Sequence, residues 1–141
     1  MNKKVFLGGT CNNSNWRNNL IDKLEIDYFN PVVDNWTEND YKNELREREN
    51  SDFCLYVITP KMTGVYSIAE VVDDSNKRPK KTIFAYLKKD NDSEFSKEQL
   101  KSLEKVGEMV KNNGGKCFTS LDEIAIYLNL KNESNRIKTY C

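Results

Sequence analysis

The sequence predicts an α/β protein in which helices cover both faces of a five-stranded parallel sheet. Short apolar segments, typical of buried strands, alternate with longer segments whose apolar residues recur every three or four positions, as in amphipathic helices. Glycine, proline, asparagine and serine gather between these segments, where turns are expected. Strands that alternate with helices pair in parallel through right-handed crossovers. The 141 residues suit one domain with a single core.

Five segments are predicted strands, and all are short and mostly apolar. They are residues 5–7, 26–29, 53–58, 81–87 and 116–118. The Gly8-Gly9 pair ends the first strand, and Asn30-Pro31 ends the second because proline cannot donate a hydrogen bond to a sheet ladder. The third is the longest apolar run of the chain, as expected of a strand that is buried on both faces.

Five helices are predicted between and after these strands. They are residues 14–24, residues 37–49, a helix that contains Glu70 and ends near residue 77, residues 96–112 and residues 120–130. Thr37 is a predicted N-cap that forms a near capping box with Asp40, and Gly114 is a predicted C-cap. Residues 90–93 are expected to form a polar loop. We expect one domain over residues 1–130, followed by a polar tail, residues 131–141, that is loose unless it docks.

Composition excludes several classes of function. Twenty-two basic and twenty-two acidic residues cancel, so the chain offers no electrostatic case for binding nucleic acid or a membrane surface. Its longest apolar run is too short to cross a bilayer, and no signal-peptide pattern opens the chain, so we expect a cytoplasmic protein. Four cysteines without a Cys-x-x-Cys pair, and no histidine, give no basis for a metal site. Cys54 and Cys117 are expected to be core thiols, and catalysis would depend mainly on carboxylates and hydroxyls.

The predicted topology places the candidate site at one edge of the sheet. A flavodoxin-like order, 2-1-3-4-5, leaves a crevice between strands 1 and 3, outside their carboxyl ends, where open α/β sheets bind ligands. Three loops should meet there, at Gly8-Gly9-Thr10, at residues 30–36 and at residues 60–64. Glu70 lies in the second turn of the next helix and shares a face with Ser67, while Ile68, Ala69 and Val72 are expected to face the core.

Each of these features also has an ordinary structural interpretation, which stays open at this point. Acidic residues such as Glu70 are common in the first turns of helices because the dipole favours them. Asp40, Glu44 and Glu47 are spaced to form one solvated face of a helix that also carries Arg46 and Arg48, as an exposed helix commonly does. Trp36 is either a platform for a base or a partly buried side chain. The Gly8-Gly9 pair is also typical of a plain turn from strand to helix.

At these residues the chain resembles the nucleoside 2-deoxyribosyltransferase family, and particularly its small deoxyribosyltransferase-like branch. The resemblance covers about the first ninety residues and rests on Lys4-Val5-Phe6-Leu7-Gly8-Gly9, on residues 31–36, on Asn43-Glu44-Leu45, on Ser51-Asp52 and on residues 64–70. It implies a flavodoxin-like or Rossmann-like three-layer fold and cleavage of the N-glycosidic bond of a (deoxy)nucleoside or nucleotide. It also implies a homo-oligomer, no cofactor, and a nucleoside or nucleotide as the partner.

The resemblance assigns roles to individual residues. Glu70 falls at the position of the nucleophilic glutamate, Glu44 at that of a helix carboxylate close to the substrate, and Trp36 near a position that contacts the base. The candidate substrate-binding residues are Gly8, Gly9, Thr10, Asn30, Asp34, Trp36, Asp40, Thr63, Gly64 and Ser67.

The chain departs from the family at two positions. Gly64 stands where an aspartate is often found, and Phe6 where a tyrosine is. These departures favour one alternative, a protein that binds a nucleotide or a nucleotide-derived signal without catalysis. A second alternative is an N-glycosidase of 5′-monophosphates, which needs phosphate-binding hydroxyls and amides around Ser67, Thr63 and the Gly8 turn, and a purely structural domain is the third.

Overall fold

The predicted sheet is confirmed. The computed structural model describes the backbone of residues 2–11 and 13–140, and side chains as far as residue 133. Five parallel strands run in the order β2-β1-β3-β4-β7. They are β1 (Lys4–Gly9), β2 (Asp27–Phe29), β3 (Phe53–Ile58), β4 (Thr82–Tyr86) and β7 (Lys116–Phe118). Counted within this sheet, that is the flavodoxin-like order 2-1-3-4-5 of a three-layer α/β fold.

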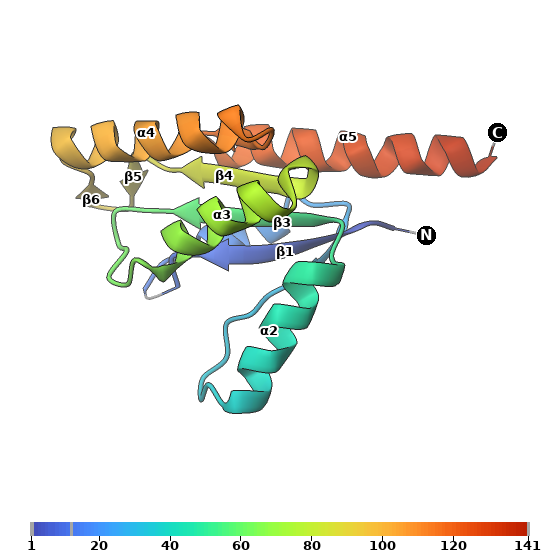
Figure 1. Cartoon of the computed structure of the whole chain (residues 1–141), viewed down its shortest axis with the longest axis horizontal. Helices are drawn as coiled ribbons and strands as arrows, with labels where there is room; N and C mark the ends of the chain where they lie inside the picture. Colours follow the sequence, from blue (N-terminus) through green and yellow to red (C-terminus); the bar gives the residue numbers. More distant parts are fainter. Residues whose placement is uncertain (1, 12, 141) are drawn as a thin grey trace.

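Helices cover both faces of the sheet, because neighbouring residues of each strand point to opposite sides. On one face, α1 (Trp16–Ile21) and α5 (Leu121–Tyr140) pack on alternate residues of β1 and β3. On the other face, α3 (Tyr66–Lys77) and α4 (Lys97–Asn112) pack on the residues between them, as Figure 1 shows for α3 and α4. β3 is buried along its whole length, as its apolar run predicts.

The helix α2 (Glu38–Asn50) projects away from the sheet (Figure 1). It begins with the predicted capping box, in which the Thr37 hydroxyl accepts from the Asp40 amide and the Asp40 carboxylate accepts from the Thr37 amide. Arg48 is its one buried residue. A polar helix of this kind depends on its caps and on a few contacts at its ends rather than on a buried apolar stripe.

Several boundaries differ from those that the sequence predicts. The polar loop at residues 90–93 is the turn of a small antiparallel hairpin, β5 (Lys89–Asp90) and β6 (Ser93–Glu94), with Asn91 in the left-handed region at φ 54°. Residues Pro79–Lys81 form a short 3-10 helix, η1. The last helix, α5, runs on to Tyr140, past its predicted end at residue 130. Buried Asn132 contributes to this extension, because its side-chain Oδ1 accepts from the Lys3 amide and its Nδ2 donates to the Glu25 carbonyl.

The buried stripe of α3 differs from the prediction at Ala69, which is exposed. Ile68 and Val72 are partly buried against the core, as predicted, and Val71 and Asp74 are fully buried. The 3.6-residue period places residues 67 and 70 beside this stripe.

Candidate active site

A pocket of about 380 Å³ lies at the carboxyl end of β1, beside the loop that follows β2. β1 contributes Phe6, Gly8 and Gly9. The loop after β2 contributes an apolar wall of Pro31, Val32, Val33 and Trp36. Glu44 from α2 and Ser67 and Glu70 from α3 supply most of its polar groups, together with Cys11 and Arg17. The volume and the mixture of apolar walls with a few polar groups are typical of a small-molecule site.

A second pocket of about 250 Å³ adjoins the first. The two share Gly9, Cys11, Ser67 and Glu70. The second is also lined by Thr10, Thr63, Gly64 and Tyr66, at the start of α3. Glu70 therefore lies where the two pockets meet, so its carboxylate can reach a ligand that extends through both.

The structure brings together most of the residues that the sequence singles out. Glu44, Glu70, Gly8, Gly9, Trp36 and Ser67 line the first pocket, and Thr10, Thr63 and Gly64 line the second. Three of the predicted binding residues line neither pocket. Asn30 accepts from the Val32 amide at 3.1 Å and shapes the loop, Asp40 caps α2, and Asp34 is exposed.

The two glycines of the β1 turn are needed by the fold. Gly9 has φ +120°, and a Cβ there would lie 2.0 Å from the Val57 carbonyl oxygen. A Cβ at Gly8 would meet the Tyr56 ring at 2.7 Å. The Thr10 hydroxyl accepts from the Thr59 amide at 2.9 Å, so it holds the ends of β1 and β3 together. This close approach of the two strands forms the floor of the site.

Glu70 is mostly buried, with 14% of its side chain exposed. Its Oε2 lies 3.2 Å from Nη1 of Arg48. Burial raises the pKa of Glu70 to about 7, since a buried carboxylate loses hydration. The Arg48 charge lowers this pKa, while the Glu44 and Asp74 charges raise it. At neutral pH this carboxyl group is therefore close to half-ionised.

Glu44 is the second carboxyl group of the pocket. The Trp36 indole Nε1 donates to its Oε1 at 3.1 Å. Burial raises the pKa of Glu44, and the Asp40 charge raises it further, against the Trp36 hydrogen bond and the charges of Arg48 and Arg17. Because the indole occupies Oε1, Oε2 is the atom that can carry a proton toward a ligand.

Arg48 was wrongly predicted to be an exposed helix cation. It is buried because Nη2 pairs with Asp74 Oδ1 at 2.9 Å. Asp74 in turn accepts a short hydrogen bond from the Tyr56 hydroxyl and pairs with Arg78 at 3.1 Å. Arg48 Nε has no hydrogen-bond partner among the described residues. The sequence signal for this network is the acidic pair Asp73-Asp74, which follows Glu70 at helical spacing. Carboxylates gathered in this way need a cation nearby.

Arg17 is a second buried cation that sequence reasoning missed. Its guanidinium donates to three backbone carbonyls of the β1 turn: Leu7 at 3.0 Å, Gly9 at 3.2 Å and Thr10 at 2.6 Å. It also lies over the Trp16 ring at 4.5 Å. Burial lowers its pKa to about 10, so it stays charged at neutral pH. A fixed positive charge therefore faces the first pocket beside Glu44.

The residues that the structure describes, which omit positions 1, 12 and 141, hold no group of three or more cysteine and acidic side chains arranged to bind a metal ion. Across the same residues, no helix is both long and apolar enough to cross a bilayer.

The fold and the pocket define an α/β protein with a small-ligand site at the carboxyl edge of a parallel sheet, lined by glutamates from two helices. A family model described as nucleoside 2-deoxyribosyltransferase like matches residues 2–89, and the chain belongs to this family. The resemblance seen in the sequence is confirmed, and the family suggests nucleoside glycosyl transfer. Comparisons with curated proteins and with solved structures gave no match.

Proposed function

We propose that this protein cleaves the N-glycosidic bond of a (deoxy)nucleoside or nucleotide, with Glu70 as nucleophile and Glu44 as proton donor. The observation that carries the proposal is that these two carboxyl groups, from different helices, line one pocket and both have raised pKa values. The family match, which includes both residues, supports the substrate class.

The reaction proceeds in two balanced steps. Glu70 attacks the anomeric carbon while the bond to the base breaks, and the bonding electrons leave with the base. A proton from Glu44 neutralises the base, so the first step yields a glycosyl ester on Glu70 and an ionised Glu44. In the second step a new base or water attacks the same carbon, Glu44 takes up the proton, and Glu70 is released.

The working form of the pair holds one proton. With two protons the nucleophile is neutral, and with none the base leaves without assistance. In the free protein burial raises the pKa of both carboxyl groups, that of Glu70 to about 7. In a bound substrate, the electron-poor sugar carbon favours an ionised Glu70, and a basic ring nitrogen of the base favours a protonated Glu44. Substrate binding therefore favours the protonation state that the reaction needs.

The two pockets suit the two ends of a nucleoside. Trp36, 55% exposed, and the apolar wall beside it offer a flat surface for the base in the first pocket. Thr63, Gly64 and the start of α3 lie in the second pocket, on the other side of Glu70. Since Val65, the N-cap residue of α3, makes no side-chain cap hydrogen bond, amides at this end are suited to an anion, which favours a 5′-monophosphate as the second candidate substrate.

The test is turnover by the intact protein. Deoxynucleosides, ribonucleosides and their 5′-monophosphates are each incubated with and without a second free base, and products are separated by chromatography. We expect free base from at least one substrate, a loss of about a thousandfold or more in Glu70→Gln, and unchanged turnover in Glu47→Gln. Glu47 is the matched control because it lies on α2 near Glu44 but pairs with Lys4 outside the pocket. Turnover that survives Glu70→Gln would sink the proposed nucleophile.

A non-catalytic binding protein is the second class of function. Its support lies in Phe6, which has no hydroxyl to hold the nucleophile, and in the ion pair that ties Glu70 to Arg48. Calorimetric binding of a nucleotide without bond cleavage over many hours would select this class. As part of the catalytic proposal we also expect a cytoplasmic homo-oligomer. Light scattering of the purified protein tests its oligomeric state.

A further inference from the structure

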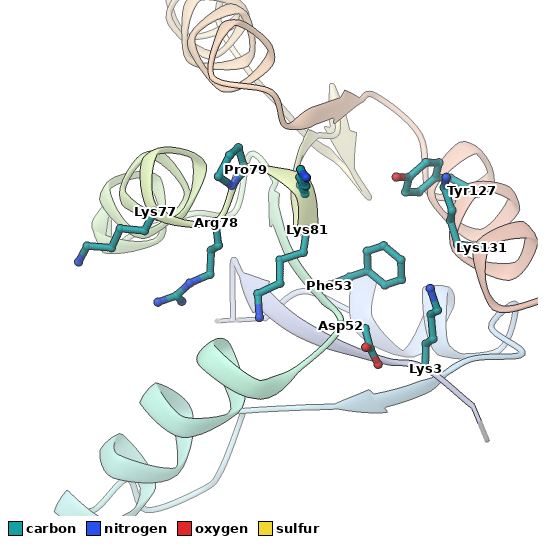
Figure 2. Close-up of a pocket in the computed structure, with 10 residues that line it drawn as sticks. Lys3, Asp52, Phe53, Lys77, Arg78, Pro79, Lys81, Tyr127 and Lys131 are labelled. Carbon is teal, nitrogen blue, oxygen red and sulfur yellow. The ribbon is translucent and has the colours of Figure 1, made fainter. Parts of the chain in front are cut away.

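A basic pocket lies at the opposite edge of the sheet from Glu70. Its volume is about 570 Å³, larger than either pocket at the crevice. It is built at the amino ends of β1, β3 and β4, where Lys3, Phe53 and Lys81 stand, and is closed by the end of α3, by η1 and by α5. Figure 2 shows Arg78 and Lys81 on one side of Phe53, and Tyr127 and Lys131 of α5 on the other. The proposed glycosidic chemistry uses none of these residues.

Six of its lining residues are basic and one is acidic. The basic residues are Lys3, Lys77, Arg78, Lys80, Lys81 and Lys131, and the acidic residue is Asp52. The whole chain has a formal net charge of zero, so this excess is a local concentration of positive charge. A concave surface lined by one sign of charge raises the local concentration of ions of the other sign.

Three of these cations already have partners within the protein. Lys81 donates to the carbonyls of Glu49 and Ser51 at 2.6 and 2.7 Å, so it closes the end of α2. Lys77 pairs with Asp73 at 3.1 Å, and Arg78 pairs with Asp74 at the same distance. Their contribution to the pocket is thus partly cancelled.

The other three cations make no ion pair within the described part of the chain. Lys3, Lys80 and Lys131 come from three separate elements: the segment before β1, η1 and α5. Lys3 Nζ lies 5.8 Å from the centre of the Phe53 ring, and Lys131 Nζ lies 5.7 Å from that of Tyr127. Asp52 offsets them only in part, because one of its oxygens accepts from the Lys4 amide at 2.8 Å.

We propose that this pocket binds an oligophosphate, meaning a run of two or three phosphoryl groups such as a nucleoside di- or triphosphate carries. A lysine contributes a compact positive charge to a phosphate, and three of them around one cavity match a ligand whose charges are spread along a short chain. The Phe53 and Tyr127 rings, which meet edge-to-face with centroids 6.2 Å apart, form an aromatic wall that adds apolar surface beside these charges. A volume of about 570 Å³ suits a small molecule.

The test is calorimetric titration of the full chain with sodium tripolyphosphate, ATP, adenosine and a single-stranded DNA oligonucleotide at constant ionic strength. The key variant is the triple Lys3→Ala, Lys80→Ala, Lys131→Ala. Its matched control is the triple Lys97→Ala, Lys101→Ala, Lys105→Ala, which removes the same charge from the exposed face of α4. We expect tripolyphosphate and ATP to bind the wild type and the control equally, and to bind the first triple about tenfold more weakly. In a second series at higher salt, the binding of both ligands should weaken.

The four ligands separate the sources of affinity. If ATP binds more tightly than tripolyphosphate, and if this advantage is lost in Tyr127→Ala, the base of ATP contacts the aromatic wall. If the two ligands bind equally, the pocket recognises phosphates alone. The proposal is overturned if neither phosphate ligand binds, if both triples lose affinity equally, if adenosine loses as much affinity as ATP in the first triple, or if only the oligonucleotide binds. None of these outcomes depends on turnover at Glu70, so the proposal stands or falls separately from the glycosidic activity.

Discussion

Arg48 Nη1 lies 3.2 Å from the Glu70 carboxylate, and Nη2 of the same guanidinium lies 2.9 Å from that of Asp74. Glu70 is therefore linked to the core by a cation that is itself held in place by a buried anion. The link also joins α2, which otherwise projects from the body of the protein, to α3. We infer that Arg48 positions Glu70 and keeps part of it ionised against the effect of burial.

Activity should have a bell-shaped dependence on pH. If one proton on the glutamate pair is needed, raising the pH through about 7 removes it and lowers kcat/KM, while acid adds the second proton and also lowers kcat/KM. In Glu44→Gln the residual rate should instead rise with pH to a plateau, because only ionised Glu70 is then required. Its midpoint should lie below 7, since the Glu44 charge no longer raises the pKa of Glu70. An unchanged bell in Glu44→Gln would contradict its role as proton donor.

Loss of Arg48 should change both stability and the pH profile. Arg48→Met leaves buried Asp74 with only Tyr56 and Arg78, and breaking a buried ion pair from one side costs about 3–5 kcal/mol of unfolding free energy. The pKa of Glu70 should rise, so the falling limb of the profile should move above pH 7. The measurements are chemical denaturation and kcat/KM against pH.

Arg46 provides the control for Arg48. It lies on the same helix but is exposed and bonds only Asn43 among the described side chains. Arg46→Met should leave both the unfolding free energy and the falling limb in place. If Arg48→Met proves too unstable to assay, Tyr56→Phe removes one hydrogen bond from Asp74 and should cost about 1–3 kcal/mol.

Glu70→Gln should stabilise the protein in a pH-dependent way. The folded-state pKa of Glu70 is raised from its ordinary value of 4.5 to about 7, so its contribution to stability is complete below about 4.5 and is lost as the pH rises through 7. Glutamine resembles the protonated form at every pH. The variant should thus gain about 3 kcal/mol over wild type at pH 8 and little at pH 4, as thermal or urea unfolding at the two pH values can show. An equal gain at both would contradict the raised pKa.

Two glycines that line the second pocket should respond differently to alanine. Gly9→Ala should prevent folding or cost several kcal/mol, because its Cβ would overlap the Val57 backbone and its φ of +120° is strained for alanine. Gly64→Ala should fold normally, since nothing lies within 4 Å of its Cβ. Circular dichroism and urea midpoints distinguish the two variants. Normal stability in Gly9→Ala would show that the β1 and β3 backbones are not this close.

The Trp36 hydrogen bond should tune Glu44 separately from base binding. Trp36→Phe removes the Nε1 donor to Glu44 but keeps an aromatic ring, so the pKa of Glu44 should rise and the acidic limb of the profile should move to higher pH. Trp36→Ala also removes the flat surface and should raise KM about tenfold more than Trp36→Phe does. Steady-state kinetics across pH separates these effects. Equal KM values in the two variants would argue against contact between Trp36 and the base.

Local patterns in the sequence determined the elements and their order. The apolar run of β3, the capping box at Thr37 and the Gly8-Gly9 turn each act through neighbours in the chain, so each can be recognised without a structure. The chirality of crossovers then leaves few possible sheet orders, and 2-1-3-4-5 was among them. Glu70, Glu44 and Ser67 were brought to one edge by this topology alone.

Only the tertiary structure decided how those groups are charged and which cations they meet. Burial of Arg48 depends on Asp74 and Tyr56, which are distant in sequence, and periodicity along α2 assigned this arginine to solvent. The raised pKa of Glu70 and the cluster of lysines at the other edge likewise depend on residues from separate elements. Helical and strand periods describe contacts a few positions apart, whereas electrostatic energies depend on distance and burial in space, which the folded chain alone defines.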